Sequence, residues 1–338
     1  MDIRNSLKGI SRRSFLKAAT AASAVAVAAP TAVTIEHRSR ELEIEHRIAR
    51  FLEDQLKTLS QFVWEEAPGP VEHLGNGLRY SPLNANKAFD NVRLFDSPVV
   101  AFASATDPLF EELKRPNVIG PNHMSPRQWL PNAKTVISYY YPLSEEIRAS
   151  NRQAGIPSIM WLAGKASAEV FVYNTNKALT QFFAGLNATS VIPDTDSRFK
   201  MVRNGNTLLP SWSERHVGYV AGLGTFGLHK SLITEKGCAG RLGSLITTLE
   251  LKPTTRPYRN KNAYCLFYLN GSCIACIDRC PGHAVTKTGN NQAAMCMKYS
   301  KETVVPAIAP LPYKGGCGKC LTSAPCEIGI PKGIKRLT

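Results

Sequence analysis

Apolar residues recur at helical spacing in a long charged segment near the N-terminus. Between positions 35 and 66 most of them are three or four positions apart: Ile44, Ile48, Phe51, Leu52, Leu56, Leu59 and Phe62. This period predicts one long amphipathic helix over residues 35–66, with its apolar stripe packed on a core. The stretch that follows, residues 68–82, is rich in Pro and Gly and predicts a loop.

Downstream of this loop, patterns typical of strands alternate with patterns typical of helices. The runs are residues 98–103, 135–141 and 243–251 for strands, and residues 158–187 and 213–220 for helices. Such alternation indicates an α/β (α+β) layer. We expect this α/β domain to cover residues 30–254 and a cysteine-rich module to cover residues 255–338.

The N-terminal 29 residues have the pattern of a bacterial signal peptide. Ser11-Arg12-Arg13-Ser14-Phe15-Leu16-Lys17 is a twin-arginine run, and an alanine-rich stretch follows it. This stretch is too short to span about 30 Å of hydrocarbon, and we expect no transmembrane helix elsewhere. The pattern predicts export by the twin-arginine route, to the periplasm or to the outer face of the cytoplasmic membrane.

Eight of the nine cysteines lie close together near the C-terminus: Cys265, Cys273, Cys276, Cys280, Cys296, Cys317, Cys320 and Cys326. The run Cys273-x2-Cys276-x3-Cys280-Pro281 reproduces most of the bacterial ferredoxin motif. Two C-x2-C pairs favour metal ligands, although an exported protein would also suit disulfides, and zinc is the other metal that such pairs bind. Eight thiolates are the number that two 4Fe-4S clusters require.

The closing cysteine of each ferredoxin motif serves the other cluster. One predicted cluster therefore has a regular set of ligands: Cys280, Cys296, Cys317 and Cys320. The other takes Cys273, Cys276 and Cys326, and it lacks a ligand because Asn270 stands where a regular motif has cysteine. Cys265 is the nearest candidate for the fourth ligand, and a cluster held by three cysteines is the alternative.

Three further features of the sequence bear on these clusters. Glu327 follows the last cysteine, where the motif has proline, and Cys238 lies in a Gly-rich loop. We expect Cys238 to be a small buried residue and not a ligand. The formal charge of +15 falls to +11 without the signal, which carries a net +4. Two clusters would lower it to about +7, a moderately basic protein.

A second motif lies upstream of the cysteines. It comprises Ser213-Glu214-Arg215-His216-Val217-Gly218-Tyr219-Val220-Ala221-Gly222-Leu223-Gly224-Thr225-Phe226-Gly227 and the segments at residues 231–234 and 240–244. Together with Cys273-x2-Cys276-x3-Cys280-Pro281 and Leu130-Pro131-Asn132-Ala133-Lys134, it resembles the superfamily of epoxyqueuosine reductases and respiratory reductive dehalogenases. The resemblance covers roughly residues 130–330. Without it, the glycine block is an ordinary turn that ends a helix.

The resemblance implies a nitroreductase-like α/β domain that binds a cobamide (a corrinoid), followed by a two-cluster, ferredoxin-like module. Electrons from a donor, with a membrane-bound protein among the candidates, would pass both clusters to the cobalt. The candidate cofactor-binding residues are Gly222, Gly224 and Gly227, because glycine lets the backbone approach a macrocycle closely.

The export signal and the lack of a carboxylate at residues 206–211 oppose chemistry on tRNA. We therefore expect a reductive dehalogenase of small organohalides, with no nucleic-acid partner. The alternatives are an electron-transfer iron–sulfur protein without corrinoid and an epoxyqueuosine-reductase-like reductase of another substrate. Dehalogenases are commonly longer and keep the regular first motif, so a third branch of exported reductases is also open.

The resemblance to dehalogenases also implies a tyrosine proton donor with a nearby Arg or Lys that lowers its pKa. The candidates are Tyr139, Tyr140, Tyr141, Tyr173 and Tyr219. We select Tyr173 with Arg203 or Arg215 as the catalytic group. Each of these residues also suits an ordinary core or surface role.

Overall fold

The structure is a computed structural model that describes residues 32–65, 92–204, 207–288, 293–309 and 316–336. The predicted signal peptide and the predicted loop at residues 68–82 lie outside the described residues. Residues 1–40 and 41–338 form two compact units, and the sheet and all nine cysteines belong to the second. None of the described helices is long and apolar enough to cross a membrane.

A four-stranded antiparallel sheet lies at the centre of this unit, in the order β1–β2–β8–β3. Its strands are β1 (Val99–Ser104), β2 (Thr135–Pro142), β8 (Gly240–Thr247) and β3 (Ser190–Val191). The three strands predicted from the sequence are therefore present, although the last begins and ends earlier than predicted. Every residue of β2 is buried, because both faces of the sheet are covered.

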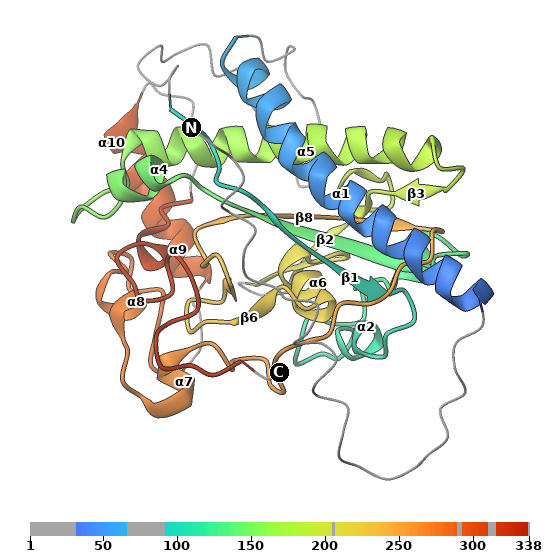
Figure 1. Ribbon diagram of the computed structural model, residues 1–338. Coiled ribbons are helices and arrows are strands. Elements are labelled where there is room, and N and C mark those ends of the chain that lie inside the picture. Colours follow the sequence, from blue (N-terminus) through green and yellow to red (C-terminus); the bar gives the residue numbers. More distant parts are fainter. Residues whose placement is uncertain (1–31, 66–91, 205–206, 289–292, 310–315, 337–338) are drawn as a thin grey trace. The chain divides into compact units, whose positions relative to one another are not determined.

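Two helices cover the faces of the sheet, as Figure 1 shows: α5 (Ile159–Ala184) and α6 (Glu214–Ala221). Both confirm helices predicted from the sequence. The side chains of β2 alternate between them, since successive residues of a strand point to opposite faces. Tyr139 donates a hydrogen bond to Asn176 of α5 at 2.8 Å, whereas Tyr140 packs in the core that contains Val217 of α6.

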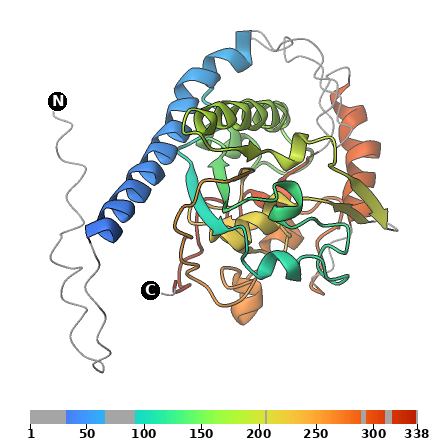
Figure 2. The ribbon, with the colours of Figure 1, turned by 90° about the vertical axis from the view of Figure 1, so that its right-hand side faces the viewer.

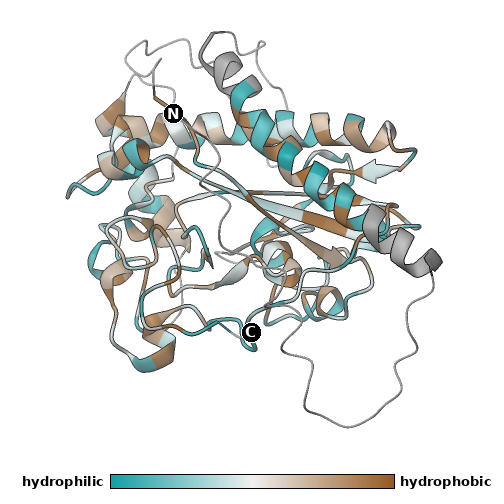
Figure 3. Ribbon diagram, viewed as in Figure 1, coloured by the Kyte–Doolittle hydropathy of each residue, from teal (hydrophilic) through white to brown (hydrophobic). Residues whose placement is uncertain are grey.

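The long helix α1 (Ala32–Glu65) agrees with the helix predicted over residues 35–66. Ile48 and Leu52 have no exposed surface, as expected for its apolar stripe. The ring of Phe51 lies 5.2 Å from that of Phe182, so this part of α1 runs beside α5 (Figure 2). Hydrophilic residues follow much of α1, whereas β2 is apolar to neutral (Figure 3).

Several short elements connect these parts, and the sequence patterns did not predict them. They are α2 (Leu109–Glu112), α3 (Pro126–Trp129), α4 (Glu145–Ser150), the 3-10 turn η3 (Pro193–Thr195), and two hairpins, β4 (Met201–Asn204) with β5 (Thr207–Pro210) and β6 (Gly224–Phe226) with β7 (Leu232–Thr234). The described chain is thus a mixed α/β fold, as predicted, with small antiparallel sheets.

The cysteine-rich C-terminal part consists of short helices joined by loops. These are α7 (Leu266–Asn270), α8 (Ala275–Asp278), α9 (Ala293–Tyr299), the π-helical turn η4 (Ser300–Val304), α10 (Val305–Ile308) and the 3-10 turn η5 (Lys319–Leu321). Asn151, the C-cap of α4, donates to Cys317 O at 3.1 Å and accepts from Lys319 Nζ at 3.1 Å. The ring of Trp161 donates to Gly316 O at 2.8 Å. These contacts anchor the loop that carries Cys317 and Cys320.

Candidate functional site

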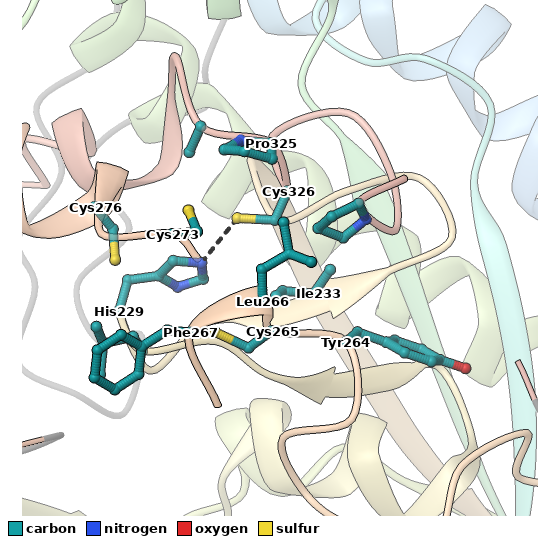
Figure 4. A pocket seen from close by; sticks show the side chains of 13 residues that line it. His229, Ile233, Tyr264, Cys265, Leu266, Phe267, Cys273, Cys276, Pro325 and Cys326 are labelled. Atoms are coloured by element: carbon teal, nitrogen blue, oxygen red, sulfur yellow. Dashed lines mark hydrogen bonds between the residues drawn. The ribbon is translucent and has the colours of Figure 1, made fainter. Parts of the chain in front are cut away.

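Four cysteines line one cavity, and we name them the first cysteine group: Cys265, Cys273, Cys276 and Cys326 (Figure 4). Cys265 caps α7, and the left-handed Gly271 (φ 73°) ends that helix and turns the chain toward Cys273. The cavity encloses about 330 Å³, part of it open to solvent. The pKa of the Cys276 thiol is raised to about 12, by burial and then by the charges of the other three cysteines.

The second cysteine group comprises Cys280, Cys296, Cys317 and Cys320. Its members come from the end of α8, from α9 and from η5. The pKa of Cys320 is raised by burial and then by the charges of the other three members, followed by that of Cys276. The second group is therefore gathered in one place, and it adjoins the first.

The chain crosses between the two groups. Cys276 and Cys280 are four residues apart in the sequence, and Cys320 and Cys326 are six apart, yet the members of each pair belong to different groups. This is the exchange of closing cysteines on which the predicted ligand sets were based. Both groups offer the soft thiolates that iron–sulfur clusters require, and the residues present fit two such clusters.

Two residues beside Cys326 were not among the predicted site residues. His229 Nε2 lies 3.4 Å from Cys326 Sγ, and Cys238 Sγ lies 3.9 Å from it on another side. All three are buried and lie close enough together to share a metal ion. The hydrogen bond from Cys238 lowers the pKa of Cys326 and raises that of Cys238, and His229 lowers the pKa of Cys326 further.

Six charged side chains from α5, η3, α6 and β8 act on one another electrostatically, and we name them the charged group: Lys165, Glu169, Asp194, Glu214, Arg215 and Arg241. Arg241 of β8 forms an ion pair with Glu169 of α5, at 3.1 Å. Burial lowers the pKa of Lys165, as does the charge of Arg241, whereas the thiolate of Cys320 acts in the opposite direction. The charged group therefore lies near the second cysteine group.

Two carboxylates of the charged group each have a buried oxygen atom for which the described residues provide no hydrogen bond. These atoms are Oε2 of Glu169 and Oε2 of Glu214. Burial and the charge of Asp194 raise the pKa of Glu214 to about 8. The raised pKa favours the protonated form of Glu214, which suits a general acid.

Arg215 has an exposed side chain, yet its pKa is lowered by loss of hydration. Its guanidinium donates to Lys230 O at 2.8 Å, which fixes its direction. The charged group thus combines three cationic side chains with three carboxylates.

Of the other two predicted catalytic residues, Tyr173 has a described side chain and Arg203 does not. Tyr173 is a half-buried residue of α5, with the ammonium of Lys177 5.5 Å from its ring centre. It lies eight residues, roughly 12 Å, from Lys165 along the helix. Arg203 belongs to β4, and its side chain lies outside the described residues. The catalytic pair stays a prediction.

The three glycines predicted to face a macrocycle pack against the protein itself. A Cβ at Gly224 would lie 2.0 Å from Ile233 O, and one at Gly227 would lie 2.6 Å from the ring of His229. Gly222 (φ 102°) is the C-cap of α6 and faces Thr254. These surroundings do not fit glycines that cradle a cobamide, so we derive no chemistry through one.

No protein-family model and no curated protein matches the sequence. Three similar solved structures are all epoxyqueuosine reductases. One is selenomethionine-labelled (18% identity, TM-score 0.44), one is from Streptococcus thermophilus (19%, 0.42), and one was solved with a tRNA-Tyr epoxyqueuosine-modified tRNA stem loop (17%, 0.44).

Each similarity covers 70% of this chain and 63 to 65% of the other chain, so the chain spans less than two thirds of these proteins. These proteins represent the epoxyqueuosine reductase side of the superfamily named above. The expectation of no nucleic-acid partner is contradicted by the structure that contains a tRNA stem loop, and we withdraw it.

Proposed function

We propose that the chain is an iron–sulfur oxidoreductase of the epoxyqueuosine reductase type, with two 4Fe-4S clusters and a substrate site at the charged group. The observation that carries this proposal is the gathering of eight cysteines into two adjoining groups of four. Clusters held there would supply one-electron transfer. Two clusters side by side suit the stepwise delivery of two electrons to one substrate.

The charged group supports the position of the substrate site. It lies near Cys320, so a substrate bound there is close to the second cysteine group. Lys165, Arg215 and Arg241 attract a substrate with negative charge, or stabilise negative charge that develops during reduction. The raised pKa of Glu214 favours its protonated form, which can donate the proton that a reduction consumes.

The proposal is tested by anaerobic reconstitution of the chain without residues 1–29. We expect about eight irons per chain and the broad absorption of 4Fe-4S clusters. Cys265→Ala and Cys320→Ala, one from each group, should each leave about four irons, whereas Cys238→Ala should keep about eight. Two irons or fewer in the unaltered protein, or zinc in their place, would reject the proposal.

A reductase and a simple electron carrier are distinguished by turnover. Reduced viologen is the electron source, and the candidate substrates are organohalides, epoxides and modified RNA stem loops. Oxidation of viologen that depends on one of these substrates identifies a reductase. The packing of the three glycines favours the electron carrier without corrinoid as the second candidate. Cobalt that is retained after reconstitution with cobalamin would instead support the prediction that the protein binds a cobamide, and with it reductive dehalogenation.

Export by the twin-arginine route is part of the proposal and has its own experiment. A reporter protein fused behind residues 1–40 should reach the periplasm of a bacterium with that route. Replacement of Arg12 and Arg13 by Lys should abolish this transport, because twin-arginine recognition depends on both residues. Transport that persists in the double variant would contradict the prediction.

A further inference from the structure

His229 is held in one orientation by the β6–β7 turn. Its Nδ1 accepts a hydrogen bond from the backbone N–H of Ser231, at 3.0 Å. The ring packs on Gly227, where a side chain would lie 2.6 Å from two ring atoms. Only 5% of the residue is exposed. A rotation of the imidazole would therefore break this hydrogen bond.

This hydrogen bond also determines the tautomer of His229. A nitrogen that accepts a backbone N–H carries no proton, so the proton of the neutral ring is on the other nitrogen, Nε2. Nε2 is the atom that lies 3.4 Å from Cys326 Sγ, and Figure 4 shows the ring directed at that sulfur. The contact is thus an N–H donor facing a thiolate.

Cys238 approaches the same sulfur from the turn between β7 and β8. Its Sγ lies 3.9 Å from Cys326 Sγ, and its backbone N–H donates to Cys326 O at 3.0 Å. Gly237 makes this approach possible, because a Cβ there would lie 1.9 Å from Glu327 O. Cys326 is therefore held at its backbone and receives a second, weaker donor at its sulfur.

We propose that His229 is a positioning residue that donates a hydrogen bond to the cluster-binding thiolate of Cys326 and raises the reduction potential of the first cluster, with Cys238 adding a smaller effect. Reduction adds negative charge to a cluster and its sulfurs, and a donor to a ligating sulfur stabilises that charge. The first cluster then accepts an electron more readily than it would without His229. This inference rests on the proposed binding of a cluster by Cys326.

The alternative role for His229 is direct coordination of iron in place of a cysteine. The structure favours the donor role, because Cys265 completes a set of four thiolates around the same cavity. Coordination would also require His229 to compete with a sulfur that it already contacts at hydrogen-bond distance. A cluster with a nitrogen ligand is therefore an outcome of the test that overturns the proposal.

The test is a redox titration of the reconstituted holoprotein, followed by electron paramagnetic resonance. We expect His229→Ala to keep about eight irons and to shift one of the two midpoint potentials to a more negative value. His229→Gln, whose amide can still donate, should shift it less, and Cys238→Ala less than His229→Ala. His283→Ala is the matched control, because His283 is exposed and lies next to the other cysteine group; it should leave both potentials unchanged.

Three outcomes separate the possibilities. Unchanged potentials in His229→Ala with full iron content would overturn the inference and leave the proposed function intact. A directly coordinated nitrogen in the hyperfine spectrum, lost in His229→Ala, would show a ligand and also overturn it. An unaltered protein that binds no iron would reject the proposed function itself before any variant is compared.

Discussion

Arg152 binds both carboxylate oxygens of Glu327, with Nη2 2.7 Å from Oε1 and Nε 3.3 Å from Oε2. Glu327 is buried, and the backbone N–H of Ser323 donates to the same carboxylate at 2.6 Å. Because Glu327 follows Cys326, the ion pair ties the end of the first cysteine group to the segment after α4. The residue that replaces the ferredoxin proline is thus an anchor for this loop.

Loss of Arg152 should be costly. Arg152→Ala leaves the carboxylate of Glu327 buried with fewer partners, and removal of one member of a buried pair costs about 3–5 kcal/mol. Because Arg148 Nε also lies 3.8 Å from Glu327, we expect the decrease in the free energy of unfolding to be near the lower end of this range. The free energy of unfolding in urea measures it. Arg336→Ala, which removes an exposed pair with Glu235, should cost about 1 kcal/mol or less. Equal losses in the two variants would contradict the anchoring role.

Glu327 illustrates a limit of the sequence patterns. The absence of proline after Cys326 is visible in the sequence, but the partner that explains it is 175 positions away. Periodicity predicted α1, α5, α6 and the long strands, because each repeats its pattern over several residues. The hairpins β4–β5 and β6–β7 were not predicted, because strands of three or four residues are too short to show a repeating hydrophobic pattern.

Gly224 should be sensitive to substitution for a reason unrelated to any cofactor. In Gly224→Ala, the new Cβ would lie 2.0 Å from a backbone oxygen of β7, so the hairpin must open. We expect the free energy of unfolding of the protein without added cofactor to fall by several kcal/mol, as for other severe steric changes.

Gly271→Ala is the control for this prediction. Gly271, unlike Gly224, adopts a left-handed conformation, and nothing lies within 4 Å of its Cβ position. Its substitution should therefore cost only the backbone strain, about 1–2 kcal/mol. If Gly224→Ala unfolds like the unaltered protein and loses only cobalamin binding, the packing role is wrong and the predicted cofactor role is restored.

The hydroxyl groups of the three consecutive tyrosines of β2 differ in their hydrogen bonding. Tyr139 donates to Asn176 at 2.8 Å and Tyr141 donates to Leu52 O at 2.7 Å, whereas no partner is found for the buried hydroxyl of Tyr140 among the described residues. Tyr139→Phe should cost about 1–3 kcal/mol, because it leaves the acceptor of Asn176 unpaired. Tyr140→Phe should be neutral or stabilising. Thermal unfolding of the two variants measures both effects, and a loss in Tyr140→Phe would reveal a partner for that hydroxyl.

The candidate site was predictable only where its residues are neighbours in sequence. The cysteine spacings are local, and the expected ligand sets were derived from them; that each set holds a cluster stays a prediction. The charged group unites side chains from α5, η3, α6 and β8, so no short motif contains it. Lys165 and Glu169 are four residues apart and have the spacing of an ordinary exposed helix pair. Only the fold places them inside the protein.

Glu214 should make the stability of the protein depend on pH. Its pKa is raised from 4.5 to about 8 on folding, so the folded state binds more protons than the unfolded state between these values. Stability from this residue is therefore present below about pH 4.5 and is lost as the pH rises toward 8. In Glu214→Gln the side chain stays neutral, and this loss should disappear. Urea midpoints at pH 5 and pH 8 measure it, with Glu146→Gln, an exposed glutamate of α4, as the control that should follow the unaltered protein. The same change in midpoint for the unaltered protein and Glu214→Gln would show that Glu214 is ionised in the folded state, and its role as proton donor would be lost with it.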